Sequence, residues 1–312
     1  MVKQTKALLS DSELIELETL AVELATWAGT EASQALNLEP EIKYKPRGPH
    51  RRPRAQDDPG DPVSAIDTNI ETEVRRRISQ RFPTHTLLGE EAEELPNPDA
   101  DWVWVIDPID GTSNFINRFP LFAVSIGLLH QGIPVVGAIW CSTTHLTGSG
   151  VYHARSGSAL RLNGQVLSEP PSQVKRRLGA APGGSPGNTP YWDNRVTGSA
   201  AFELAMVSAK VFTSVPLWSL SIWDVAAGVC LAWSANLEVW IRRDGEWVEF
   251  ERFDPALNGV EKSTSKDLSL RHWRSPLIVG NSQACEYWVA RAGKVLGLRG
   301  RVSRRLRRFL SV

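Results

Sequence analysis

Two aspartates separated by two residues, Asp107 and Asp110, follow an apolar run in the segment WVWVIDPIDGTSNF. Pro108 restricts the residue before it to an extended conformation. An irregular Asp-x-x-Asp turn can then direct both carboxylates, together with the carbonyl oxygen of Ile109, into one space. Oxygen ligands of this kind suit hard divalent cations, chiefly Mg²⁺. The segment therefore predicts a metal site.

Anion binding is predicted directly after these aspartates. If a helix begins at Gly111, the backbone N–H groups of Gly111, Thr112 and Ser113 have no partner within that helix and face the same space. Amides in this arrangement bind phosphate oxygens. A phosphate group beside a metal ion is the natural inference from the two features together.

Further carboxylates come from two other places in the chain. Glu90 and Glu91 end an apolar run, and Asp224 opens a helix of small residues. Each piece alone has an ordinary interpretation: Glu90 and Glu91 as a solvated acidic turn, Asp224 as a helix cap, and Asp107 and Asp110 as turn formers. It is improbable that all of these ordinary interpretations hold at once, because each group lies where an element ends.

Alternating helix and strand patterns are expected to position these groups. Ser10 and Glu13 have the spacing of a capping box, and an apolar stripe follows from Leu14 to Ala28. A second helix is predicted over Ile66 to Ile78, with Asp67 in its first turn. Strands are predicted for HTLLGEE, WVWVID, LFAVSIGLLH and IPVVGAIW, with a Gln131-Gly132 turn between the last two, and buried helices for GSAAFELAMVSAK and WDVAAGVCLAW. The fold class is α/β or α+β.

Two lobes that share a cleft are expected from the length of 312 residues. Residues 179–190 contain so much Gly and Pro that no regular element is expected there, which makes them the best connection between lobes. The predicted parts are an N-terminal α+β lobe (1–178), a C-terminal α/β lobe (191–290) and a basic tail (291–312). The first lobe carries Asp67, Glu90, Asp107 and Asp110, and the second carries Gly198 and Asp224.

Composition excludes several classes of protein. The 35 Lys and Arg residues balance 35 Asp and Glu residues, so a bulk polyanion binder is excluded. No stretch has the length of a signal peptide or a membrane span, and a cytoplasmic protein is expected. The three cysteines are too far apart for a zinc knuckle or a disulfide framework, and the six histidines show no metal-ligand spacing.

The motifs DPVSAID, GEE, DPIDGTSNF, GSAA and WDVAAG, in this order, resemble those of the Mg²⁺-dependent inositol monophosphatase family. The resemblance covers roughly residues 10 to 290. It implies an alternating α/β/α/β/α layered sandwich, lithium-sensitive hydrolysis of small phosphate monoesters and, frequently, a homodimer. It also implies two or three Mg²⁺ ions in each active site.

The resemblance assigns a role to each matching position. It makes Glu90, Asp107 and the carbonyl of Ile109 ligands of a first metal ion. It makes Asp107, Asp110 and Asp224 ligands of a second. The residues that it places around the substrate are Asp67 and Thr112, which orient the attacking water; Glu91, a supporting carboxylate; and Gly198, Ser199 and Ala200, a small-residue turn beside the substrate.

Two positions depart from the family pattern. Relatives that hydrolyse inositol phosphate usually carry an acidic residue a few positions before the Trp-Asp pair, and Leu217 stands there instead. A sugar-like ring would lose a charge-assisted hydrogen bond of about 1.5–3 kcal/mol, which weakens the inositol assignment. Trp218 is the expected aromatic wall of the ligand site. After the helix, Ser234 to Leu237 replace the Glu-Ala-Gly-Gly often found in the family.

Two basic stretches leave the substrate and partners open. The stretch from Lys43 to Arg54 has six basic residues among three prolines and is predicted to be a mobile loop. It could meet a second phosphate, as in a bisphosphate or nucleotide 3′-phosphate phosphatase, or it could be a solvated loop. The basic residues at 291–308 could contact an acidic surface or RNA, or form a plain solvated terminus. A non-catalytic regulatory or nucleic-acid-binding relative is the third alternative, and a Mg²⁺-dependent phosphatase of a small phosphorylated metabolite is the leading one.

Overall fold

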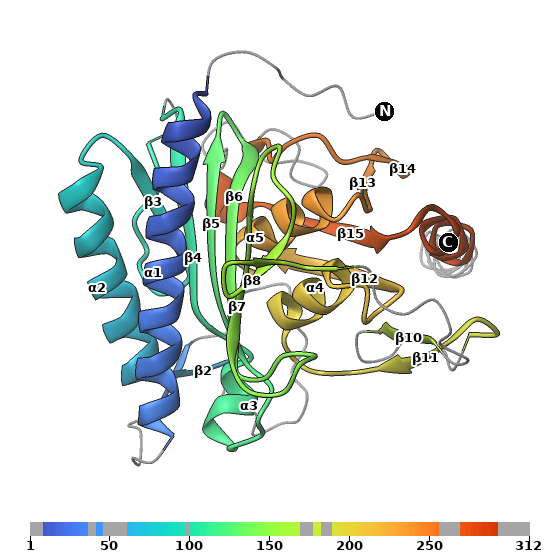
Figure 1. Ribbon diagram of the computed structural model, residues 1–312, viewed down its shortest axis with the longest axis horizontal. Coiled ribbons are helices and arrows are strands. Elements are labelled where there is room, and N and C mark those ends of the chain that lie inside the picture. The colour runs from blue at the N-terminus through green and yellow to red at the C-terminus, as the bar shows by residue number, and fades with distance from the viewer. Residues whose placement is uncertain are drawn as a thin grey trace, which may run out of the picture.

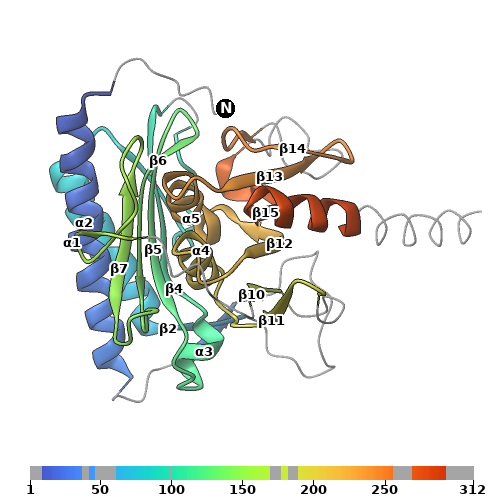
Figure 2. The same cartoon turned by 45° about the vertical axis from the view of Figure 1, so that its right-hand side comes forward.

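The computed structural model describes residues 9–36, 42–45, 61–97, 100–168, 177–181, 189–255 and 269–292. These residues form alternating layers of helix, sheet, helix, sheet and helix (Figures 1 and 2). The predicted α/β/α/β/α sandwich is therefore confirmed. The regular elements are α1 (Asp11–Ala35), β1 (Ile42–Lys45), β2 (Asp61–Ser64), α2 (Ala65–Arg81), β3 (Thr86–Gly89), β4 (Trp102–Asp110), α3 (Thr112–Ile116), β5 (Ala123–His130), β6 (Ile133–Cys141), β7 (Gly150–Arg155), β8 (Arg161–Leu162), β9 (Gln165–Val166), β10 (Arg177–Ala180), β11 (Trp192–Arg195), α4 (Ala200–Ser208), β12 (Ser214–Ser221), α5 (Ile222–Ser234), β13 (Glu238–Arg243), β14 (Glu246–Glu249), η2 (Leu270–His272) and β15 (Arg274–Gly280).

The outer helical layer consists of α1 and α2, which pack against the first sheet. Both helices begin as predicted. The Ser10 hydroxyl accepts a hydrogen bond from the Glu13 amide, which caps α1. In α2, the buried residues Ile70, Val74 and Ile78 repeat at four-residue spacing and face the sheet.

The first sheet has the strand order β3-β4-β5-β6-β7-β8-β9. The first two strands run parallel and the later pairs antiparallel. Helices cover both faces, which explains why the central strands read as continuous apolar runs. Gln131 and Gly132 have φ angles of 51° and 81°, so the predicted turn between β5 and β6 is a two-residue hairpin of the type that matches strand twist.

The middle layer consists of α4 and α5, and nearly every residue of both helices is buried. Small residues let these helices lie between two sheets. At the end of α5, Asn236 adopts a φ of 57° and the Leu237 amide donates to the carbonyl of Ala232. Asparagine tolerates this left-handed conformation, so the helix ends in an ordinary left-handed cap without the family's glycine.

The second sheet has the order β12-β15-β13-β14 and carries one more helical layer, residues 282–292. Alternation along β15 shows its two faces: Leu277 and Val279 pack against α4 and α5, whereas Ile278 packs against the last helix. Trp288 of that helix is buried and donates from Nε1 to the Ser214 hydroxyl at 2.9 Å. None of the described helices is both long and apolar enough to cross a membrane.

Two predictions about loops need correction. Gly179 and Ala180 were expected in an irregular connection, but they end β10, because parallel pairing with β11 satisfies their backbone groups; residues 182–188 lie outside the described residues. Lys43 to Lys45 were expected in a loop, but they belong to β1, which pairs with β2 before the first proline at Pro46; residues 46–60 lie outside the described part. The basic tail from residue 293 onward also lies outside it.

The division into two lobes stays a prediction. One cluster of buried hydrophobic residues includes members of both predicted lobes, from Leu88 and Val103 to Leu277 and Val279.

Candidate functional site

The parallel pair β3 and β4 places Glu90 beside Asp107. In the register of this pair Gly89 lies opposite Ile106, and the Glu90 amide donates to the Ile106 carbonyl at 3.2 Å. Because parallel strands end at the same edge, the next residue of each strand, Glu90 and Asp107, leaves the sheet at the same point. Two carboxylates separated by sixteen positions in the sequence are thereby neighbours.

A β-bulge brings Asp107 and Asp110 together. Asp107 pairs with Ser125 and Asp110 with Ala123, so three steps along β4 match two steps along β5. In a regular strand, residues three apart point to opposite faces, but one extra residue reverses this alternation. The sequence predicted an irregular turn at this place. The irregularity lies within the strand pairing.

Two helix N-termini supply the remaining carboxylates. Asp67 and Asp224 each occupy the third position of a helix, α2 and α5, and each helix begins after a serine in a capping box. The amides of Ser64 and Ser221 donate to Oδ2 of these aspartates at 2.9 and 2.7 Å. This hydrogen bond fixes each carboxylate at the positive end of its helix.

Together these elements form the carboxylate cluster, which we define as Asp67, Glu90, Asp107, Asp110 and Asp224. Oxygen atoms of Asp107, Asp110 and Asp224 lie within 4.8 Å of one another. Burial, and then the negative charge of Glu90, raise the pKa of Asp107 well above its usual range. Burial also raises the pKa of Asp67 to about 6, of Asp110 to about 7 and of Asp224 to about 8, and neighbouring carboxylates add to each shift. The raised pKa values mean that burial and mutual repulsion disfavour the ionised form of these acids in the folded chain.

The donor atoms fit a hard divalent cation. Oδ1 of Asp107 is buried and has no hydrogen-bond partner among the described residues. Buried carboxylate oxygens are ordinarily paired, and oxygen-only donor sets of high negative charge suit Mg²⁺. A cation between Asp107, Asp110 and Asp224 would satisfy this atom and offset the repulsion.

Thr112 lies at the edge of the cluster. Its hydroxyl donates to the Ile109 carbonyl at 2.9 Å, and its oxygen lies 3.4 Å from Oδ1 of Asp67. Because the hydroxyl proton points to Ile109, the lone pairs of Thr112 remain available to accept a hydrogen bond. The structure thus brings Asp67, Ile109 and Thr112 together, as the sequence predicted.

The predicted small-residue turn meets the cluster at Asp110. The Ser199 hydroxyl and the Ala201 amide donate to Oδ2 of Asp110 at 2.7 and 2.5 Å, and Ser199 also caps α4. Gly111, the cap of α3, has a φ of 91°, and a β-carbon there would lie 3.2 Å from Cβ of Ser199. Only glycine combines this conformation with so close an approach. Gly198, Ser199 and Ala200 therefore adjoin the first turn of α3, which includes Thr112 and Ser113.

Two supporting side chains were not predicted. Glu71, one turn after Asp67, is buried and accepts hydrogen bonds from the amides of Glu91 and Ala92 at 2.7 and 3.0 Å. The Asn114 amide group donates to the carbonyls of Leu121 and Thr197 at 2.6 and 2.8 Å and ties α3 to the turn before α4. The four-residue spacing of Glu71 from Asp67 is a signal that could have identified it; no local pattern identifies the partners of Asn114.

Leu217 is 2% exposed and belongs to the hydrophobic core cluster between the second sheet and the middle helices, opposite Leu277. Its predicted place beside the ligand, where relatives carry an acidic residue, stays a prediction. Trp218 points to the other face, where its ring meets Trp247 at 6.2 Å. Trp247 packs against the cluster beneath residues 282–292. The role of Trp218 as a substrate wall stays a prediction, as does the supporting role of Glu91.

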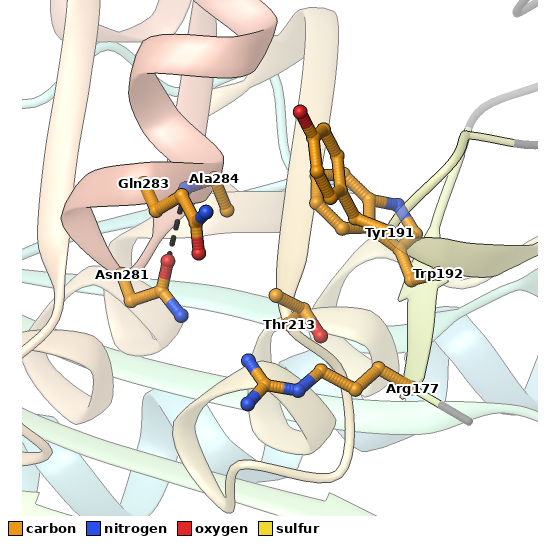
Figure 3. A pocket seen from close by; sticks show the side chains of 7 residues that line it. All are labelled: Arg177, Tyr191, Trp192, Thr213, Asn281, Gln283 and Ala284. Atoms are coloured by element: carbon orange, nitrogen blue, oxygen red, sulfur yellow. Dashed lines mark hydrogen bonds between the residues drawn. The ribbon is translucent and has the colours of Figure 1, made fainter. Parts of the chain in front are cut away.

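A separate pocket lies between β11 and the start of the last helix (Figure 3). Its floor is the buried Trp192, and the exposed side chains of Arg177, Tyr191, Asn281 and Gln283 surround it. Asn281 uses Oδ1 to accept from the Ala284 amide and so caps the helix. This pocket shares no lining residue with the carboxylate cluster.

Comparison with known proteins identifies the family of the chain. The sequence model of the inositol monophosphatase family matches residues 13–267. The chain is 33% identical over 212 residues to an inositol-1-monophosphatase of Mycobacterium bovis (60% of this chain, 70% of that protein). It is 29% identical over 184 residues to a fructose-1,6-bisphosphatase/inositol-1-monophosphatase of Aquifex aeolicus (54% and 68%). A solved structure of an IMPase/NADP phosphatase complexed with Mg²⁺ and phosphate has the same fold, with a TM-score of 0.63 at 19% identity over 89% of this chain and 95% of that one.

Proposed function

The chain belongs to the inositol monophosphatase family and is a phosphoric monoester hydrolase, and on this basis we propose that it hydrolyses a small-molecule phosphate monoester with Mg²⁺ held by the carboxylate cluster. The observation that carries the proposal is the convergence of Asp107, Asp110 and Asp224 within 4.8 Å, with a buried oxygen of Asp107 unpaired among the described residues.

The ligand roles that we propose are those that the family resemblance implies. We assign Glu90, Asp107 and the Ile109 carbonyl to one Mg²⁺ ion and Asp107, Asp110 and Asp224 to a second; a third ion would be held less completely by the chain. The Ile109 carbonyl accepts from Thr112 and retains a second lone pair for a cation. When bound, paired Mg²⁺ ions act as Lewis acids that acidify water and offset charge on the phosphoryl and leaving-group oxygens.

Asp67 and Thr112 orient the attacking water in this proposal. The lone pairs of Thr112 accept one water proton, and Oδ1 of Asp67, 3.4 Å away from the threonine oxygen, accepts the other. Two fixed acceptors leave one water lone pair directed at phosphorus. Asp67 can then take the proton that the water loses on attack, with no covalent intermediate on the chain.

The phosphate is expected to lie against the first turn of α3. The amides of Gly111, Thr112 and Ser113 point from the helix start, and the turn at Gly198, Ser199 and Ala200 adjoins it. Since α3 has five residues, the amides rather than a macrodipole would bind the anion. The leaving group would extend away from this turn.

A bisphosphate is the second candidate substrate. The ribbon of β1 and β2 carries Lys43 and Lys45, leads into the cap of α2 at Ser64 and packs against α3. Basic residues are thereby tethered close to the proposed phosphate site. The Aquifex aeolicus relative is described as a fructose-1,6-bisphosphatase as well as an inositol-1-monophosphatase.

A substrate panel tests both candidates. Phosphate release from inositol 1-phosphate, histidinol phosphate, fructose 1,6-bisphosphate and 3′-phosphoadenosine 5′-phosphate is measured with Mg²⁺ and with a chelator. Mg²⁺-dependent release from at least one ester is expected; no release above that of D107N contradicts the proposal. If changing Arg51 and Arg52 to Ala leaves bisphosphate turnover intact, the basic stretch does not recognise a second phosphate.

Three further expectations stay predictions: a homodimer, a cytoplasmic location, and contact of the basic residues 291–308 with an acidic surface. A non-catalytic, nucleic-acid-binding relative is disfavoured by the complete set of carboxylates. It would be supported by catalytic silence together with salt-dependent RNA binding that truncation after Tyr287 abolishes.

A further inference from the structure

The segment that carries Glu90 has no regular structure of its own. After Gly89 ends β3, the residues from Glu90 to Ala92 form a bend and an irregular stretch. A carboxylate on such a segment can hold a cation at a fixed distance from Asp224 only if other side chains fix its backbone. The structure shows two side chains that do so, one through the amide groups of the segment and one through its carbonyl groups.

The first of these side chains is Glu71 of α2, which binds the amide groups of the segment. Its carboxylate accepts from the amides of Glu91 and Ala92, and Nε of Arg75 donates to the same carboxylate at 2.8 Å. The Glu71 carboxylate lies so close to Gly89 that a β-carbon on Gly89 would be 2.3 Å from the carboxylate carbon of Glu71. The amide groups of the segment are thereby tied to α2.

The second side chain is Arg271 of η2, which lies 181 residues after Glu90 in the sequence and binds the carbonyl groups of the segment. Its Nη1 donates to the Gly89 carbonyl at 2.7 Å and its Nη2 to the Glu90 carbonyl at 3.3 Å. The same guanidinium lies over the ring of Trp223, 5.4 Å from the centroid. Trp223 directly precedes Asp224. One side chain therefore links the backbone of Glu90 to the start of α5.

We propose that Arg271 is a positioning residue that sets the separation of Glu90 from Asp224 and thereby the affinity for Mg²⁺. This inference rests on the proposed function, in which both carboxylates bind metal. Its guanidinium donates hydrogen bonds to backbone carbonyls rather than to the carboxylates of the cluster, while its charge also interacts with Glu71 and Glu90; a lysine keeps that charge and removes the two-carbonyl geometry. Only arginine suits the position, because a planar fork can donate to two carbonyls and lie on an indole ring at once, whereas lysine presents a single point charge.

The test compares R271K with a matched control, R77K. Arg77 also lies over an indole, that of Trp27 at 4.2 Å, and pairs with Glu73, but it bridges α2 to α1 and, within the described residues, makes no hydrogen bond or ion pair with the carboxylate cluster or the segment of Glu90. Mg²⁺ is titrated into each metal-free protein by calorimetry, and phosphate release is measured against Mg²⁺ concentration. We expect R271K to bind Mg²⁺ about 10- to 100-fold more weakly, as for loss of a side chain that orients a metal ligand. Saturating Mg²⁺ should restore much of its turnover, and R77K should match the wild type.

A merely structural role for Arg271 predicts a different result. It would lower the unfolding temperature of metal-free R271K and the amount of active protein, but leave the Mg²⁺ concentration for half-maximal turnover unchanged; that result overturns the inference. If R271K does not fold, E71Q serves instead. It weakens the hydrogen bonds that the amides of Glu91 and Ala92 donate to Glu71, and it should weaken Mg²⁺ binding in the same way. Equal Mg²⁺ affinity in the wild type and the folded variant refutes the positioning role alone. A wild type that binds no Mg²⁺ refutes the proposed function and this inference with it.

Discussion

Two buried acidic sites lie against the first sheet: the single residue Glu18 and the carboxylate cluster. They differ in whether the protein itself supplies the positive charge that balances them. Glu18 of α1 meets His153 and Arg155 of β7, with Nδ1 of His153 at 2.7 Å and Nη1 of Arg155 at 2.8 Å. Burial alone would raise the pKa of Glu18, but the hydrogen bonds from His153 and Arg155 and the charge of Arg155 outweigh it and lower the pKa. The Gly164 amide donates to Nε2 of His153, so Nδ1 carries the proton that Glu18 accepts.

For Asp67, Asp107, Asp110 and Asp224, the described residues supply no ion pair of the kind that Glu18 has with Arg155. The acids around Asp107 receive hydrogen bonds from serine and backbone groups, and Arg274 lowers the pKa of Asp224 only as a minor contribution. Every resolved pKa in the cluster is raised. The same fold therefore supplies cations to one buried acid and leaves the other group for a cation from solution. This difference separates an acid that stabilises the fold from acids that serve a reaction.

Replacing Asp107 with Asn should give the largest effect. It removes the carboxylate shared by both proposed metal ions, so phosphate release should fall by at least about 100-fold, more than for loss of a residue that only orients a ligand. The metal-free variant should be no less stable than the wild type, because an unpaired buried charge is removed. Kinetics and thermal unfolding without Mg²⁺ check the two parts; a large loss of stability in D107N would contradict the comparison.

Replacing Glu18 with Gln should have the reverse pattern. Removing one member of a buried ion pair leaves Arg155 with only the exposed Asp11 as a charge partner and should lower the free energy of unfolding by about 3 kcal/mol. Mg²⁺ affinity and turnover of the folded variant should stay within about twofold of wild type, since distant sites act independently. Urea unfolding and Mg²⁺ titration measure these quantities. A Mg²⁺ affinity that falls with stability would show that the two regions are coupled.

The stabilisation by Mg²⁺ should increase with pH. The stabilising contribution of Glu18, whose folded pKa is lowered, is present above its ordinary pKa of 4.5 and is lost as pH falls through the folded value. Asp67, Asp110 and Asp224, whose pKa is raised in the folded chain, contribute to stability with the opposite sign. The folded chain holds their protons more tightly than the unfolded chain does, so these acids lower the stability of the fold as pH rises from about 4 towards about 8. Unfolding temperatures measured with and without Mg²⁺ should therefore differ more at pH 8 than at pH 5; an equal difference at both values would contradict this account.

Replacing Ser199 with Ala should have the smallest effect. The variant loses a hydrogen bond to Asp110 and the cap of α4, which together should cost about 1 kcal/mol of stability. Asp110 keeps its bond from the Ala201 amide, so turnover should fall only a few fold. Thermal unfolding and steady-state kinetics test this; a loss as large as that of D107N would show that Ser199 itself contacts the substrate.

Local patterns predicted the elements that carry the site. The apolar stripe after Ser10, the hairpin at Gln131 and the carboxylates at strand and helix ends all depend on nearby residues, and the structure has them where expected. The pairing of Asp107 with Asp110 came from their spacing, whereas Asp224 joined them as a metal ligand only through the family resemblance. Carboxylates in separate elements meet only through the sheet register and the packing of α5 against it.

Contacts between residues far apart in the sequence were not predictable from local patterns. Arg271 reaches Glu90 across 181 residues, and no pattern near either residue indicates it. The pairing of Leu217 with Leu277 across the second sheet likewise has no signal in the residues near either of them. The bulge at Asp107 also escaped prediction, because its irregular pairing depends on the register with β5.

The most direct test of the central claim is a crystal structure of the protein grown with Mn²⁺ in place of Mg²⁺, which makes the ion visible by its anomalous scattering. The account predicts anomalous peaks bonded to the oxygens of Asp107, Asp110 and Asp224, with Oδ1 of Asp107 among the ligands. Density that shows these carboxylates without a peak, or paired with a cationic side chain of the protein, would contradict it.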